Sequence, residues 1–194
     1  TASGIVNAGI INAGLSGGSF TIQGNGSFPN QGTINVSNGT LSLASSSWSN
    51  TGTIAVTGGT LDLQGNGLTL AQLGTVTQSG GVVNLQTTLN DTGATLKVGT
   101  GTTLGTLTLA SSGTIQNGTI VDQGSGIAFS GGTLSGVSYD GTLNLSSTSS
   151  YVYITNGLTL AGVNGTGLGT INLTGQSAQI FAEGGQTINN ATLK

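Results

Sequence analysis

The sequence predicts an all-β protein folded as a parallel β-helix, or β-solenoid, with roughly 20 residues in each coil and about nine coils. Three observations support this prediction. A phrase repeats along the chain, apolar and polar residues alternate inside each repeat, and Gly or Asn separates the alternating segments. Each coil of such a fold buries its aliphatic side chains only when neighbouring coils stack on it.

The repeat is clearest where "GTINVSNGTLSL" (32–43) is followed by the closely similar "GTIAVTGGTLDL" (52–63). An aliphatic residue then recurs about once per coil along the rest of the chain, and Thr precedes it at eight of the nine positions. We therefore expect one outward threonine ladder with an aliphatic ladder behind it. The aliphatic series is Ile34, Ile54, Val76, Leu96, Ile115, Leu134, Ile154, Ile171 and Ile188.

Segments such as "TINV" and "TLDL" alternate with period two, as in strands that face a core on one side. Turn residues separate them, so we expect no helices and a rod about 45 Å long, at about 4.8 Å per coil. Asn117 and Asn190 are predicted to lie in turns and to bond neighbouring backbone, and Asn7 and Asn12 share this pattern.

The composition excludes several classes of function. Charged residues make up 4% of the chain, and Lys97 and Lys194 are its only cations. Nucleic-acid binding, which needs clustered Lys and Arg, is therefore excluded. The chain has no Cys or His, and we expect neither a cofactor nor a metal site. No apolar run is long enough for a membrane-spanning helix. Residues 1–194 are interpreted as one β-solenoid domain, expected to be a segment of a longer repeat protein.

Units such as "INAG", "GTINV", "GGTLDL" and "GTINLTG" resemble the β-helical repeats of large bacterial surface proteins. These include autotransporter passengers and filamentous-haemagglutinin-like adhesins. The resemblance covers nearly the whole chain and implies a right-handed parallel β-helix. It also implies export to the cell surface and a role in adhesion, biofilm or surface coating. It assigns no functional residue, because the repeats of that family are scaffold.

An enzyme on this fold needs paired carboxylates in one groove. Asp122 and Asp140 are close to one coil apart, so they are candidates for such a pair. We favour turn positions for both, where carboxylates cap backbone amides. We therefore expect no catalytic residue and no enzymatic activity.

Three aromatic residues are candidates for ligand contact. Trp48 is predicted to lie in a polar loop, where it either stacks on sugar rings or covers the side of the rod. In "YVYI", Tyr151 and Tyr153 are predicted to lie on one side of a strand and to interrupt the threonine ladder. A threonine array can also bind ice, but ice binding needs Thr-x-Thr in each coil. The residue two places after each threonine-ladder position varies in type along this chain.

The leading interpretation is a structural or adhesive stalk at the bacterial cell surface or outside the cell. The alternatives are a carbohydrate-binding module on a solenoid face, and a self-assembling extracellular matrix or ice-binding protein. The expected partners are glycans or other surface proteins, with end-to-end self-association through the open ends of the solenoid.

Overall fold

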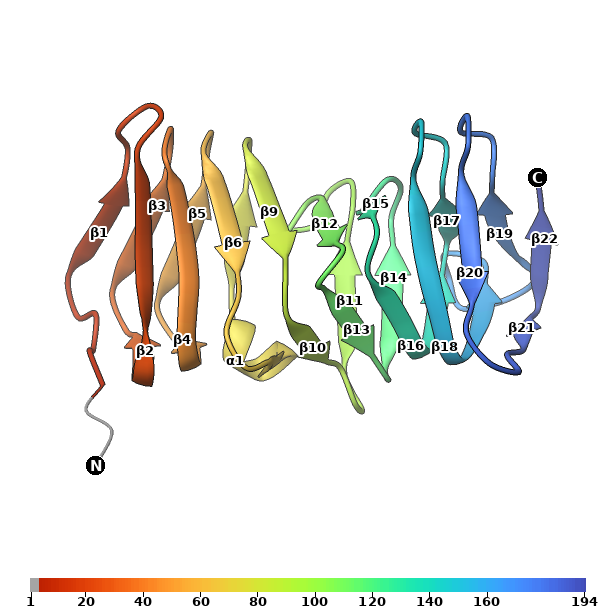
Figure 1. Ribbon diagram of the computed structural model, residues 1–194, viewed down its shortest axis with the longest axis horizontal. Coiled ribbons are helices and arrows are strands. Elements are labelled where there is room, and N and C mark those ends of the chain that lie inside the picture. The colour runs from red at the N-terminus through yellow and green to blue at the C-terminus, as the bar shows by residue number, and fades with distance from the viewer. Residues whose placement is uncertain (1–3) are drawn as a thin grey trace.

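The computed structural model describes residues 4–194 as a β-solenoid of about nine coils. The strands stack in parallel along the long axis, and the first strand, β1, and the last, β22, lie at opposite ends of that axis (Figure 1). The predicted all-β class and parallel stacking are confirmed. Coil length varies more than the sequence repeat suggests, and this variation decides where individual residues lie.

The longest continuous wall is a six-stranded sheet in the order β15-β12-β9-β6-β4-β2. Every pair in it is parallel, and the one printed register shift, between Gly24 and Ser27 in the β2–β4 pair, lies beyond the residues of one phase that stack from coil to coil. Two apolar columns run through it, one from Phe20 to Ile127 and one from Ile22 to Phe129. Its strands are β2 (Ser19–Asn30), β4 (Thr40–Asn50), β6 (Thr60–Leu63), β9 (Val82–Leu85), β12 (Leu107–Ala110) and β15 (Ile127–Ser130).

A second wall covers only the N-terminal part of the solenoid. It has four strands in the order β1-β3-β5-β8, and its inward column comprises Ile11, Ile34, Ile54 and Val76. The predicted stacking of these three aliphatic repeats, Ile34, Ile54 and Val76, is therefore confirmed. The strands are β1 (Ile10–Ala13), β3 (Thr33–Val36), β5 (Thr53–Val56) and β8 (Val76–Gln78).

The C-terminal part is built on a branched nine-stranded sheet and a three-stranded sheet in the order β17-β19-β22. In the larger sheet β16 and β18 are long strands that pair side by side across a bend. Its strands are β7 (Leu68–Thr69), β10 (Thr88–Asn90), β11 (Thr95–Val98), β13 (Thr114–Gln116), β14 (Thr119–Asp122), β16 (Thr133–Asp140), β18 (Tyr151–Ala161), β20 (Gln179–Ala182) and β21 (Ile188–Asn189). The smaller sheet comprises β17 (Thr142–Asn144), β19 (Gly169–Asn172) and β22 (Ala191–Leu193).

One helical turn, α1 (Leu70–Leu73), contradicts the expectation that the chain contains no helix. Thr69 caps it: its hydroxyl accepts a hydrogen bond from the Gln72 backbone N–H at 3.2 Å, and the Gln72 side chain accepts one from the Thr69 N–H at 2.8 Å. This reciprocal capping satisfies backbone donors that a single turn leaves open. Leu73 is buried, so the turn contributes to the core.

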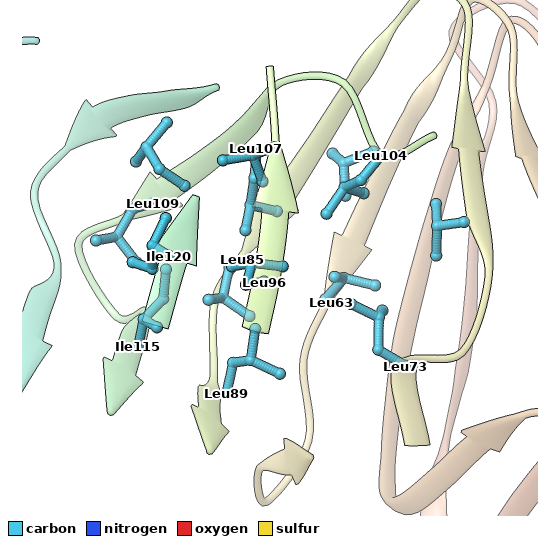
Figure 2. Packing of buried hydrophobic residues seen from close by; sticks show 14 of the residues in the cluster. Leu63, Leu73, Leu85, Leu89, Leu96, Leu104, Leu107, Leu109, Ile115 and Ile120 are labelled. Atoms are coloured by element: carbon cyan, nitrogen blue, oxygen red, sulfur yellow. The ribbon is translucent and has the colours of Figure 1, made fainter. Parts of the chain in front are cut away.

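A single apolar cluster fills the solenoid from Ala13 to Ile171. Figure 2 shows its middle part, where Leu63, Leu85 and Leu107 point from successive strands into the interior. Leu89, Leu96 and Ile115 approach the same space from the other walls (Figure 2). Alternation places these side chains inward, and stacking removes them from water on every side.

The predicted single threonine ladder is wrong. Leu96 pairs with Ile120 rather than with Ile115, and Ile154 pairs with Ala182 rather than with Ile171. The reason is that coils differ in length. In the N-terminal part, strand pairing places Thr53 opposite Thr33. In the C-terminal part it places Thr170 opposite Thr142, which is farther away in sequence. Where a coil is longer, equal spacing in sequence puts successive repeat positions on different walls.

A buried ladder of asparagine side chains joins the first coils. The Asn7 Nδ2 donates to Asn30 Oδ1 at 2.7 Å, and the Asn30 Nδ2 donates to Asn50 Oδ1 at 2.7 Å. Each amide nitrogen also donates to a backbone oxygen of the next coil, such as that of Thr53 at 3.3 Å from Asn30. All three side chains are buried, so their hydrogen bonds satisfy groups that water does not reach.

We expect Asn30→Ala to lower the free energy of unfolding by about 2–4 kcal/mol, because it leaves buried partners on Asn7 and Asn50 without their hydrogen bonds. Asn35→Ala is the matched control. Asn35 donates to Asn12 at 2.8 Å in a pair that lies at the surface, and its loss is expected to cost less than about 0.5 kcal/mol. Urea denaturation measures both values, and equal losses contradict the ladder's role.

Candidate functional site

The candidate site is a group of three outward-facing rings near the C-terminal end of the solenoid, called here the aromatic cluster: Tyr151, Tyr153 and Phe181. Strand β18 buries Val152 and Ile154 inward, and alternation turns Tyr151 and Tyr153 outward. The prediction that these two tyrosines share one side of a strand is confirmed. Their rings meet edge to face, with centroids 6.0 Å apart.

Phe181 comes to the cluster from β20, which pairs with β18 in parallel and places it opposite Tyr153. The two rings stack with centroids 4.9 Å apart and an interplanar angle of 22°. Tyr151 meets Phe181 edge to face, at 6.1 Å and 88°. Both arrangements are favourable for aromatic quadrupoles, so the cluster holds its own geometry.

Gly131 makes room for the cluster. It has φ +95°, and a Cβ added at this position would lie 2.8 Å from the Tyr151 hydroxyl oxygen. Its backbone N–H donates to the Tyr151 carbonyl at 3.1 Å. A side chain at residue 131 therefore displaces the Tyr151 ring as well as straining the turn.

Farther along β18 the outward surface changes from aromatic to polar. Asn156 has φ +55° and bends the strand, and its Nδ2 donates to Ser135 Oγ at 2.8 Å. The Gly157 N–H donates to the Gln186 side chain at 2.7 Å. A depression of about 310 Å³ lies at this bend, lined by glycines and by neutral polar groups such as Thr159 and Asn189.

Trp48 does not belong to this site, and the prediction of an exposed loop residue is wrong. It lies within β4, far along the solenoid from β18 (Figure 1), and only 3% of its surface is exposed. Its Nε1 donates to the Gln64 carbonyl at 3.1 Å. The inward phase of β4 shifts by one residue here, from Leu41, Leu43 and Ser45 to Trp48 and Asn50, and this shift turns the indole inward, where a sugar ring cannot reach it. The alternative interpretation, that Trp48 covers the side of the rod, also places it too far out.

Asp122 and Asp140 do not form a carboxylate pair. Asp140 pairs with Val121, the neighbour of Asp122, so the two carboxylates point to opposite faces of the sheet. The Asp122 Oδ1 accepts the backbone N–H groups of Gly124 and Gly126, each at 2.8 Å. The expected role of Asp122 as a turn cap is therefore confirmed, whereas Asp140 lies in strand β16.

Tyr139 completes the environment of Asp122 from inside the core. Its hydroxyl donates to the Asp122 Oδ2 at 2.5 Å, and its ring is fully buried. Burial raises the pKa of Tyr139 well above its usual value, and the charge of Asp122 and the hydrogen bond to it add to this effect. The phenol therefore remains a donor, and the pair stabilises the turn.

Asp91 is a fully buried carboxylate in another turn. Its Oδ2 accepts the Leu96 N–H at 3.2 Å, whereas its Oδ1 is a buried atom with no hydrogen-bond partner. Burial raises the pKa of Asp91 to about 6, against the smaller, opposite effect of the Leu96 hydrogen bond. The described residues contain no cluster of three or more potential metal-ligating Asp or Glu side chains.

The predicted turn asparagines differ in their surroundings. Asn117 and Asn190 have φ +61° and +56°, which confirms the predicted turn positions, and the Asn190 Nδ2 donates to the Leu160 carbonyl at 2.6 Å. Asn7 is buried in the ladder and also bonds neighbouring backbone, because its Oδ1 accepts the Gly9 N–H at 3.1 Å, whereas Asn12 lies in strand β1.

Phe181 is the member of the cluster that sequence reasoning missed. A period of about 20 residues places the partner of Tyr153 near residue 173. The coil between β18 and β20 is longer than this, and it brings Phe181 to that place instead. The alternating segment "QIFA" is the one local signal that could have identified Phe181 as an outward strand residue.

The chain matches no protein-family model, and searches of curated proteins and of solved structures also gave no match. In residues 4–194, no helix is long and apolar enough to cross a membrane.

We expect the Asp91→Asn variant to have a flatter pH dependence of stability. The pKa of the Asp91 carboxyl is 3.8 in the unfolded chain and about 6 in the folded chain, so protonation of Asp91 stabilises the folded state. This stabilisation is complete below pH 3.8 and is lost as the pH rises from about 4 to 6. Over that range the variant should gain up to about 3 kcal/mol relative to the wild type.

Denaturant unfolding of both proteins at pH 4, 5, 6 and 7 measures this effect. A constant difference between variant and wild type at all four pH values contradicts the raised pKa of Asp91.

Proposed function

We propose that the chain is a rod segment of a bacterial cell-surface or secreted adhesin, which holds a contact surface away from the cell. The observation that carries this proposal is the pair of apolar columns that run from β2 to β15, stacked in register. Parallel backbone hydrogen bonds accompany the columns along the rod, so each coil is held by the coils on both sides.

The placement of the chain ends supports the same role. The described chain enters at one end of the long axis and leaves at the other (Figure 1), which suits a spacer that separates what lies on its two sides. The charged residues are few, at 4% of the chain, and the outward strand positions carry mostly Thr, Ser and Asn. Such a surface stays hydrated without attracting nucleic acid or anionic lipid.

The resemblance of the repeats to those of large exported bacterial proteins supports the proposed location outside the cell. The threonine repeat, by contrast, gives no particular support to an ice-binding function, because its members are spread over three sheets.

Antibody labelling of intact source cells tests the proposal. An antibody raised against the folded chain should label cells that have not been permeabilised, and protease treatment of intact cells should remove the label. An antibody against a cytoplasmic protein is the control and should label only permeabilised cells. If the chain is likewise detected only after permeabilisation, the proposed location and function are wrong.

A further inference from the structure

We propose that the outward face of β18 and β20 binds a neutral oligosaccharide, with Phe181 as the ring on which one pyranose stacks. This inference goes beyond the rod function and does not depend on it. Five side chains define the face: Gln179, Phe181 and Glu183 in a front row, and Tyr151 and Tyr153 behind them.

Phe181 offers one free ring face. Its other face is stacked against Tyr153. Within the described residues β20 pairs with β18 alone, so no neighbouring strand covers the second face, and Phe181 remains 37% exposed. A pyranose ring presents a face of C–H groups, which pack on the negative face of an aromatic ring.

Polar groups lie on both sides of Phe181. Gln179 and Glu183 are two residues before and after it, about 7 Å away along the backbone, and all three residues are exposed on the outward side. The Glu183 N–H donates to the Ile154 carbonyl at 3.1 Å, which continues the ladder past the end of β20. The amide of Gln179 both donates and accepts, and the Glu183 carboxylate accepts from two hydroxyls, so the hydroxyls at the rim of a sugar ring find partners.

The charge of the face indicates which sugars it takes. Glu183 lies beside Phe181, whereas Lys97 lies in β11, outside this face. A carboxylate next to the stacking ring repels uronic or sialic acids and accepts hydrogen bonds from neutral sugars. We therefore assign neutral hexose-based oligosaccharides as the ligand class.

The face is also held in place before any ligand arrives. Tyr153 supports Phe181 by stacking, and Tyr151 meets both rings edge to face. Rings fixed in this way lose little side-chain freedom when a ligand binds, which favours affinity.

Titration calorimetry tests the proposal with a panel of tetrasaccharides. The panel contains neutral members built from glucose, galactose, mannose or N-acetylglucosamine, and acidic members that carry sialic or uronic acid. We expect at least one neutral member to bind, Phe181→Ala to weaken that binding at least about tenfold, and Phe181→Trp to retain it.

Phe20→Ala is the matched control. Phe20 is 49% exposed but lies in β2, at the opposite end of the solenoid, so its loss should leave binding unchanged. Thermal unfolding of each variant checks that the fold is intact. Glu183→Gln should admit acidic members that the wild type rejects, and this change of selectivity is a readout that a purely structural role does not produce.

Three results overturn the proposal: no neutral member binds at millimolar concentration, only acidic members bind, or folded Phe181→Ala binds as tightly as the wild type. Binding of an extended peptide along the free edge of β20, with no sugar bound, also overturns it and assigns the face to a protein partner. None of these results affects the rod function, which surface labelling tests separately.

Discussion

The fold depends on the register between successive coils. When strands pair in parallel without slippage, residues of one phase stack directly, and the aliphatic positions of neighbouring coils become continuous columns such as that from Ile22 to Phe129. A shift of one residue would turn a whole strand's apolar side chains to the solvent. The buried asparagine ladder fixes the same register at a corner, because each amide reaches the next coil only when the coils are aligned.

The same constraint leaves the outward face free to vary. Outward side chains do not contribute to the buried apolar columns. Equivalent outward positions in different coils can therefore carry threonine, a polar network or a group of aromatic rings. The Asp62 carboxylate, for example, accepts hydrogen bonds from Asn84 at 2.7 Å and Gln86 at 3.0 Å on the outside of the β6–β9 pair. The aromatic cluster uses this freedom where Tyr153 stands opposite Thr133 of the preceding coil.

The sequence predicts this fold well where coils have equal length. The stacking of Ile34, Ile54 and Val76 follows directly from spacing and alternation. Prediction fails where turns lengthen a coil, because a turn insertion changes which wall a residue reaches without changing its local pattern. Tyr151 and Tyr153 were predictable from alternation in one strand, whereas Phe181 reaches them only through the pairing of β20 with β18 across a long coil. Trp48 was misplaced because strand β4 continues through the polar residues beside it, and its inward phase shifts by one residue between Ser45 and Trp48.

The most direct test of the central claim compares two deletions by far-ultraviolet circular dichroism during heating. Removal of residues 33–52 joins Gly32 to Thr53, which occupies the register position of Thr33, so the variant loses one whole coil and keeps its columns. We predict a cooperative β-type transition for this variant. Removal of residues 33–42 takes out half a coil, misaligns every later wall and should abolish that transition. Equal behaviour of the two deletions would contradict the claim that coil register holds the fold together.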